Sequence, residues 1–181
     1  FTAWIAVVSY SIQIYCDFAG YSNMAIGISL MLGLHIEENF NFPYLARNIS
    51  DFWRRWHITL TEWIRDYLYI PLGGSRNGKQ RKYLNLLIVM TLCGLWHGSA
   101  WTFILWGFIH GILLVINHCW KGSTWQSHFT HYTKFYPFAS WVLTFLSVTL
   151  CWILFRSNNI GQAMSILVKL FSFNNAGLVW L

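Results

Sequence analysis

Long apolar runs separated by one polar stretch dominate the pattern of hydrophobic and polar positions in this chain. Residues 1–34 and 84–117 are almost wholly apolar, and residues 136–156 form a further run that Arg156 closes. A membrane-spanning helix needs about 20 apolar residues in succession. The pattern therefore predicts several apolar helices that lie within a bilayer.

Asp17 interrupts the first apolar run. The segment before it is nearly long enough to cross a membrane, and the segment 20–34 is shorter and rich in Gly and Ser. An acid between two apolar segments is costly at membrane depth and is typically paired or functional. We therefore expect two apolar pieces here, with a functional carboxylate between them.

The second apolar run, residues 84–117, is too long for one span. As a single helix it would measure about 50 Å, whereas the hydrocarbon core is about 30 Å thick. We expect a break near Gly94–Ser99. Small residues spaced by four, in the pairs Gly94/Gly98 and Gly107/Gly111, let helices approach closely in lipid.

Residues 35–82 differ in kind from the runs on either side. Trp53, Trp56, Leu60 and Ile64 recur at helical spacing, and charged residues occupy the other faces. Ser50 and Asp51 are suitable N-cap residues for this stretch. The pattern predicts one or two amphipathic helices, interfacial or re-entrant, that end before Pro71–Gly74 and a basic turn.

Composition supports a membrane protein. Of the 181 residues, 56% are hydrophobic and only 10% are charged, against about 25% charged in soluble domains. The 12 Trp residues suit the interface between lipid and water. These values exclude intrinsic disorder, a coiled coil and a disulfide-rich secreted domain, and they predict an all-α polytopic integral membrane protein.

The net charge of +6 does not indicate a nucleic-acid partner, because the charges are concentrated in one segment. Eight of the 12 Lys and Arg residues lie between His35 and Lys82. A basic segment between apolar ones is typical of a cytoplasmic loop under the positive-inside rule. The expected partner is the lipid bilayer.

Three other kinds of site are not favoured. The four cysteines lack CxxC spacing and fit small apolar packing residues. Residues 73–79 match part of a phosphate loop, but Gln80 stands where Ser or Thr is needed for Mg²⁺. His97 and His110 would be about 20 Å apart on one helix, with no partner histidines for haem on other spans. We expect no bound metal or cofactor.

Two histidines are candidates for catalysis. His97 stands near two glycines between apolar runs, and burial would keep its imidazole neutral and able to take a proton. His57 ends the densest aromatic and cationic cluster, Asp51–His57. The two come from different elements and could converge on one cavity. The alternatives are a packing histidine for His97 and an interfacial anchor helix for His57.

Four motifs occur in order: YCDFAGYS at Tyr15–Ser22, DFWRRWH at Asp51–His57, RDYLYIPLGG at Arg65–Gly74 and LWHG at Leu95–Gly98. Together they closely resemble the membrane-bound O-acyltransferase (MBOAT) family. The nearest branch is the bacterial one that acetylates alginate or transfers D-alanine to teichoic acid. The similarity runs from about residue 8 to residue 118.

This resemblance implies that His97 is the catalytic histidine and that His57 is its second signature residue. It also implies a tunnel joining a cytoplasmic acyl donor to an acceptor at the other face. We expect the substrate or the tunnel to meet six further residues, namely Asp17, Trp53, Arg54, Trp56, Asp66 and Trp96. Relatives are longer and the chain starts inside an apolar run, so we expect residues 1–181 to form one partial MBOAT domain.

The expected activity is acetyl transfer from acetyl-CoA or another acyl thioester. The acceptor would be a cell-envelope polysaccharide such as alginate, or a periplasmic acetyltransferase or acceptor protein that works with this multi-pass protein of the cell inner membrane. Three alternatives remain open: D-alanyl transfer to teichoic acid, a transporter with His97 and Asp17 as a proton relay, and a catalytically idle scaffold.

Overall fold

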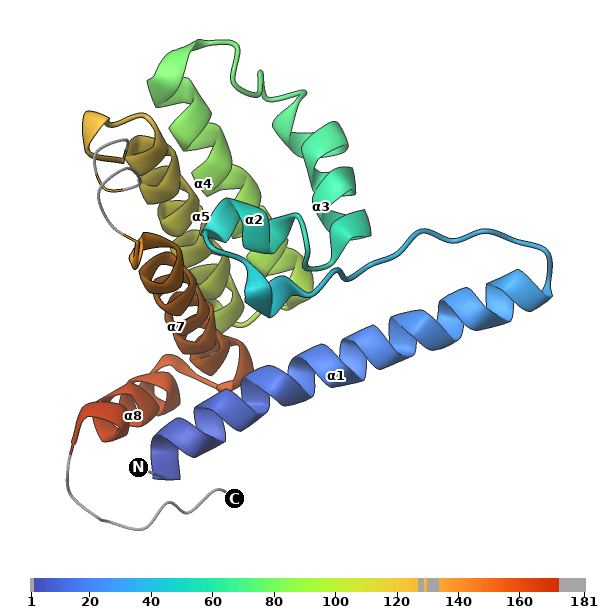
Figure 1. Ribbon diagram of the computed structural model, residues 1–181, viewed down its shortest axis with the longest axis horizontal. Coiled ribbons are helices and arrows are strands. Elements are labelled where there is room, and N and C mark those ends of the chain that lie inside the picture. The colour runs from blue at the N-terminus through green and yellow to red at the C-terminus, as the bar shows by residue number, and fades with distance from the viewer. Residues whose placement is uncertain (1, 127–128, 130–133, 173–181) are drawn as a thin grey trace.

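The computed structural model describes residues 2–126, 129 and 134–172, and over these residues the chain is helical without strands (Figure 1). This confirms the predicted all-α fold. The elements are α1 (Thr2–Met31), η1 (Pro43–Leu45), α2 (Ile49–Trp53), α3 (Ile58–Ile64), a π-helical turn η2 (Arg65–Tyr69), α4 (Gly78–His97), α5 (Trp101–Lys121), α7 (Tyr136–Arg156) and α8 (Ile160–Phe171).

The first apolar run forms one helix, so the expected division at Asp17 was wrong. α1 continues through Asp17 and Gly20 for 30 residues, or about 45 Å. No proline interrupts it, and a glycine within a helix costs only about 1 kcal/mol. Its C-terminal half extends away from the other helices (Figure 1), and apolar side chains such as Met24 and Ile28 are exposed there.

The second apolar run breaks where expected. α4 ends at His97 and α5 begins at Trp101, and the two helices pack as a close hairpin. A Cβ atom on Gly107 would meet the carbonyl oxygen of Met90 and lie 3.0 Å from the Cα of Gly94. The small residues therefore do allow close packing, as predicted.

The polar segment forms two short helices, as predicted, but its N-cap lies earlier than expected. The side chain of Asn48 caps α2 by accepting from the backbone N–H of Asp51 at 3.0 Å. Ser50 instead donates to the side chain of Asn117 at 2.9 Å. Ser50 and Asp51 were therefore wrong as caps, because the helix begins one turn before the hydrophobic pattern suggests.

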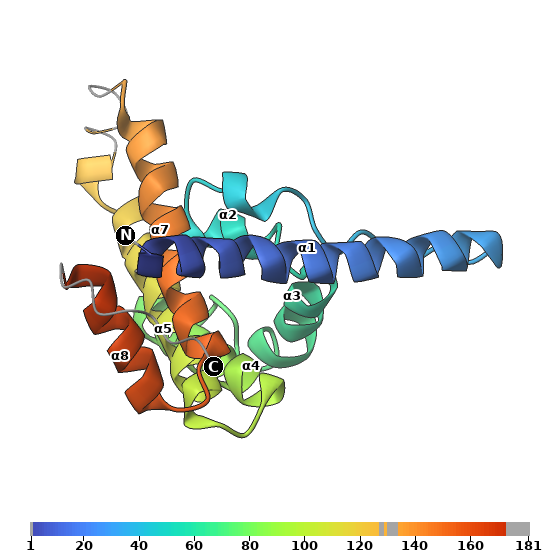
Figure 2. The same ribbon diagram turned by 90° about the horizontal axis from the view of Figure 1, so that it is seen from below.

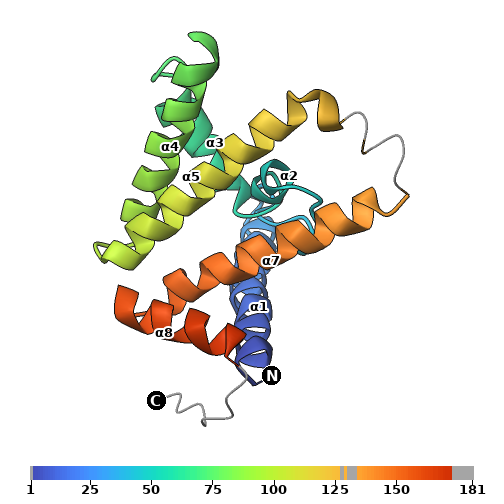
Figure 3. The same cartoon turned by 90° about the vertical axis from the view of Figure 1, so that its left-hand side faces the viewer.

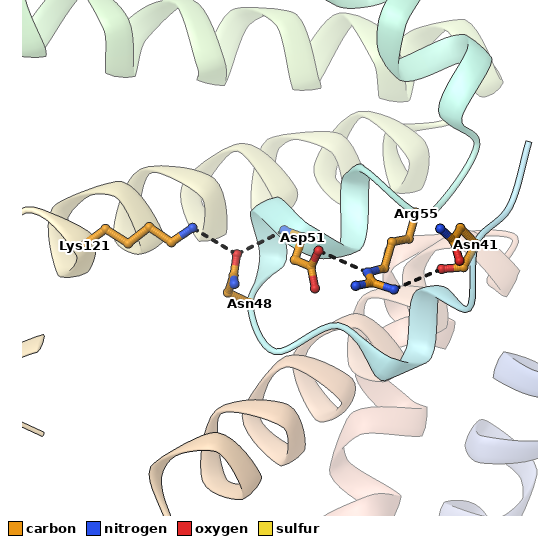
Figure 4. A network of polar contacts seen from close by, with 5 residues as sticks. All are labelled: Asn41, Asn48, Asp51, Arg55 and Lys121. Carbon is orange, nitrogen blue, oxygen red and sulfur yellow. Dashed lines mark hydrogen bonds and ion pairs between the residues drawn. The ribbon is translucent and has the colours of Figure 1, made fainter. Parts of the chain in front are cut away.

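A chain of polar contacts anchors α2 (Figure 4). Asn48 also accepts from Lys121 at the end of α5, at 3.2 Å. Arg55 pairs with Asp51 at 3.0 Å and donates to the backbone carbonyl of Asn41 at 3.4 Å. These contacts hold α2 between α5 and the segment that follows α1.

α7 lies at the centre of the molecule and contacts α1, α5 and α8. Figures 2 and 3 show α1 crossing α7, with α8 beside the start of α1. The indole N–H of Trp4 donates to the carbonyl of Leu170 at 3.1 Å across the α1–α8 contact. In the described part of the chain, α5 and α7 are the two helices long and apolar enough to cross a membrane.

The α4–α5 hairpin generates a first prediction. Gly107→Ala places a methyl group against the backbone of Met90 and Gly94, which cannot move aside as a flexible side chain would. We expect this variant to lower the thermal unfolding midpoint of the protein in detergent by 5 °C or more. Gly27→Ala is the control, because nothing lies within 4 Å of its Cβ and alanine favours the helix. Equal midpoints for the two variants would contradict the proposed packing.

Candidate active site

His97 is the last residue of α4, where the chain turns into α5. Its ring meets Trp106 and Phe155 edge-on, with ring centroids 5.3 and 5.2 Å away. The residue is half-buried, so aromatic side chains hold the imidazole without enclosing it. The complete desolvation expected from the sequence is therefore only partial.

His57 stands between α2 and α3, with its backbone in the left-handed conformation at φ +45°. Its Nδ1 lies 3.1 Å from the side-chain oxygen of Asn39, and its ring centroid lies 4.7 Å from that of Phe18 on α1. Burial lowers the pKa of His57 to about 4, with a smaller contribution from the charge of His97. His57 is therefore a neutral base near pH 7.

The fold brings the two histidines together across 40 residues of sequence. The ring of Trp96 contacts both, with centroid separations of 6.5 Å to His57 and 4.9 Å to His97. Trp96 is itself 64% exposed, so the group that joins the imidazoles also faces outward. The two histidines therefore lie near each other, as the sequence allowed, although neither is among the lining residues of the cavities described below.

A buried aromatic layer supports His97 from α5. Trp106 lies between His97 and His110, whose ring centroid is 4.8 Å from its own. The indole N–H of Trp53 donates to Nδ1 of His110 at 3.3 Å. His110 is fully buried, and it lies close to His97 because α4 and α5 are separate antiparallel helices rather than the single long helix of the haem argument.

A cavity of about 410 Å³ runs between α3, α4 and α5. Exposed Arg54 and Arg65 and half-buried Lys82 border it, and buried apolar side chains including Met90 and Cys93 line it. Cys93 is one helical turn from His97, and Thr61, also in the lining, is one turn from His57. The cavity therefore leads along α3 and α4 toward the two histidines.

A second, open cavity of about 660 Å³ lies between α1 and α7. Phe18 and Phe155 line it, and these are the rings that contact His57 and His97. The polar part of its lining consists of Tyr10, Gln13, Asp17 and Arg156. Rings that contact the two imidazoles therefore border the cavity with the mixed polar lining, and the cavity with the basic border ends one helical turn from each histidine.

The structure places the other predicted site residues in three kinds of position. Trp53 and Arg54 line the first cavity, and Asp17 lines the second. Trp56 is buried in an aromatic cluster, 4.9 Å from Trp152 between ring centroids. Asp66 is exposed, pairs with Arg65 at 2.7 Å and lines neither cavity, so the geometry does not bring it to the histidines.

Several residues that shape the site have no clear signal in the sequence. Phe155 and Trp106 are ordinary apolar residues of their helices, and Phe18, although part of the Tyr15–Ser22 motif, had no assigned role; their contacts with the imidazoles arise from helix packing. Asn39 belongs to a short irregular segment. His110 carried a signal, as a histidine within an apolar run, but its contact with Trp53 could not be foreseen.

Comparison with known proteins gives a consistent result. Residues 1–171 match the model of the membrane-bound O-acyltransferase family. The chain is 44% identical over 176 residues to a peptidoglycan O-acetyltransferase of Helicobacter pylori, covering 97% of this chain and 33% of that protein. It is 46% identical over 175 residues to a Pseudomonas syringae protein named "Probable alginate O-acetylase AlgI", covering 96% and 32%.

A teichoic acid D-alanyltransferase of Streptococcus thermophilus is more distant, at 36% identity over 118 residues, which cover 61% of this chain and 28% of that protein. The chain spans about a third of the length of the curated relatives it matches.

The lowered pKa of His57 predicts a dependence of stability on pH. The unfolded imidazole has a pKa near 6.5, so between about pH 6.5 and 4 the unfolded chain binds a proton that the folded site refuses. This contribution to stability is present above pH 6.5 and is lost as the pH falls through 4. The thermal unfolding midpoint should therefore drop between pH 7 and pH 4.5, and the drop should be smaller in His57→Asn. Identical pH dependence in the two proteins would contradict the assignment.

Proposed function

The chain belongs to the membrane-bound O-acyltransferase family, and from that premise we propose that it transfers an acetyl group from a thioester donor to a hydroxyl acceptor. One observation carries this proposal: two half-buried imidazoles, both in contact with Trp96, lie near two cavities of different chemistry. Such a pair can transfer a proton between reactants that enter from the two cavities, which an isolated packing histidine could not do.

The first cavity suits the donor. Its apolar interior fits a pantetheine arm and an acetyl group, and its basic border fits the phosphates of a carrier such as coenzyme A. Lys82 adds a cationic group beside His118, at 3.2 Å. Arg55, by contrast, is paired with Asp51. The Arg54 and Lys82 side chains are therefore the better candidates for phosphate binding.

The second cavity suits the acceptor. Asp17, Gln13, Tyr10 and Arg156 offer both donors and acceptors of hydrogen bonds to a hydroxyl compound. In the reaction, His97 takes the proton of the acceptor hydroxyl as its oxygen bonds to the acyl carbon. The C–S bond breaks, and the proton passes to the thiolate that leaves. Positioned proton transfer of this kind contributes about 10²–10⁴-fold.

The chain fits a multi-pass protein of the cell inner membrane. α5 and α7 are long and apolar enough to span, and the exposed apolar side chains of α1 suit contact with lipid or with further helices. Residues 35–82 carry most of the positive charge, which supports a cytoplasmic position for the border of the donor cavity. The bilayer is then the permanent partner of the chain.

The acceptor we propose is a cell-envelope polysaccharide such as alginate, reached directly or through a periplasmic acetyltransferase or acceptor protein. Relatives named for alginate and peptidoglycan acetylation match 94–97% of this chain at 44–46% identity. Those named for teichoic acid D-alanylation match only 58–61% at 36%. Acetyl transfer is therefore favoured over D-alanyl transfer as the proposed function.

Removing the base tests the proposal directly. In the full-length protein, His97→Ala should abolish ester-linked acetate on the cell envelope while leaving the protein inserted and folded. The control is His35→Ala, since His35 is exposed and lines neither cavity. Acetate released by mild alkali measures the outcome. Undiminished acetylation in a folded His97→Ala protein would remove the mechanism and favour a scaffold, and proton transport without an acyl donor would favour a transporter.

The donor cavity gives a second test. Arg54→Gln combined with Lys82→Gln removes two charges from its border and should raise the KM for acetyl-CoA about tenfold with little change in kcat. Arg76→Gln is the control, because Arg76 lies in the same basic segment but outside the cavity lining. If the double variant and the Arg76→Gln control both keep the KM of the unmodified protein and differ only in binding to anionic vesicles, the charges of Arg54 and Lys82 serve the membrane surface. The assignment of this cavity to the donor then fails.

A further inference from the structure

Asn39 lies at the centre of a small hydrogen-bond network beside His57. Its side-chain oxygen, Oδ1, is 3.1 Å from Nδ1 of His57. The same oxygen accepts from the backbone N–H of Thr59 at 3.3 Å and from the Thr59 hydroxyl at 3.0 Å. Its amide nitrogen points the other way and donates to the hydroxyl of Ser22 on α1 at 3.4 Å.

These contacts determine which nitrogen of His57 carries the proton. A backbone N–H can only donate, so the atom that faces Thr59 must be the amide oxygen of Asn39. That oxygen has no proton to give, so Nδ1 of His57 must donate to it. In a neutral imidazole the other nitrogen, Nε2, is then unprotonated and carries a lone pair.

We propose that Asn39 is a positioning residue that holds His57 in the Nδ1–H tautomer, with Nε2 presented as a proton acceptor. A carbonyl oxygen or carboxylate behind a histidine commonly fixes ring orientation and tautomer in this way. The same contact orients the ring, because Asn39 bonds to one edge of the imidazole while Phe18 contacts it in a T-shaped arrangement.

The backbone around His57 supports this role. His57 is the N-cap residue of α3, yet its side chain caps nothing. Asn39 caps the helix from another segment: its carbonyl accepts from the N–H of Ile58 at 3.0 Å, and its side chain accepts from the N–H of Thr59. The left-handed backbone at His57 is unfavourable for a residue with a Cβ atom, and with no role as a cap the ring contacts Phe18 and Trp96 instead.

The consequence deepens the proposed function and rests on it. With Nε2 unprotonated, neutral His57 cannot donate from that nitrogen to the carbonyl oxygen of an acyl group. It can accept a proton, either from the acceptor hydroxyl or from an N–H of His97. His57 is thereby assigned to the proton-accepting side of the reaction rather than to stabilisation of the acyl oxygen.

A spectroscopic measurement tests the tautomer without relying on activity. The full-length protein, labelled with ¹⁵N-histidine and reconstituted in lipid, should show His57 with a protonated Nδ1 and a bare Nε2 at pH 7.5. The His57 signals are identified by their loss in His57→Gln. Asn39→Ala should shift them toward a mixture of tautomers, whereas Thr59→Val, which removes a neighbouring donor to the same oxygen, should leave them unchanged. A protonated Nε2 in the unmodified protein would overturn the proposal.

Kinetics test the consequence. With acetyl-CoA as donor, Asn39→Ala should lower kcat roughly 10–100-fold and leave KM within about twofold. Asn39→Asp restores an acceptor oxygen and should recover most of kcat at pH 8.5, where the imidazole beside the new carboxylate is still neutral. Thr59→Val should retain near-normal kcat.

The two tests fail separately. If the unmodified protein shows the Nδ1–H tautomer of His57 but transfers no acetyl group, only the proposed function is contradicted. If a folded Asn39→Ala protein has mixed tautomers but a normal kcat, only the positioning role of Asn39 is contradicted. If Asn39→Ala does not fold, the Asn39→Asp variant decides, since failure of a folded Asn39→Asp protein to retain the Nδ1–H tautomer contradicts the role of the oxygen.

Discussion

The close approach of α4 and α5 positions His97 and the aromatic side chains that support it. Because Gly94 and Gly107 carry no side chains, the two helix backbones nearly touch, and the turn between them is short. That contact sets Trp106 beneath His97 and His110 beneath Trp106. The indole of Trp53 in α2 then donates a hydrogen bond to His110. This contact fixes the position of α2, and His57 follows four residues after Trp53. The position of one imidazole thus depends on the packing that places the other.

The buried surroundings of His57 favour a neutral imidazole, and a neutral imidazole can exist as either of two tautomers. Burial keeps His57 uncharged, but an uncharged ring has two tautomers with opposite abilities at each nitrogen. Only a partner with a known hydrogen-bonding direction can choose between them. Asn39 has such a direction because the backbone of α3 fixes its amide. Helix capping and control of the base are therefore served by the same side chain.

The sequence was sufficient for the features that follow from local chemistry. Hydrophobic runs located α5 and α7, the long apolar run required a break before Trp101, and the glycine pairs indicated the hairpin. Features that depend on packing between distant segments could not be predicted from the sequence. Nothing in the local pattern showed that α1 continues through Asp17, that Asn48 rather than Ser50 caps α2, or that Asp66 faces away from the histidines. The partner of His57 lies 18 residues away in an irregular segment, where periodicity has no predictive value.

Under the proposed function, the two cavities bear on how an acyl group would cross a membrane. Phe18 and Phe155 line the second cavity and contact His57 and His97, and Trp96 contacts both imidazoles. A donor that fills the basic-bordered cavity therefore needs to present only its thioester at the imidazoles, while its charged portion stays at the border. The acceptor needs to bring only a hydroxyl from the second cavity. In the function proposed above, neither reactant would need to cross the hydrocarbon core, and only the small, uncharged acetyl group would change sides, which avoids the large cost of moving charge into lipid.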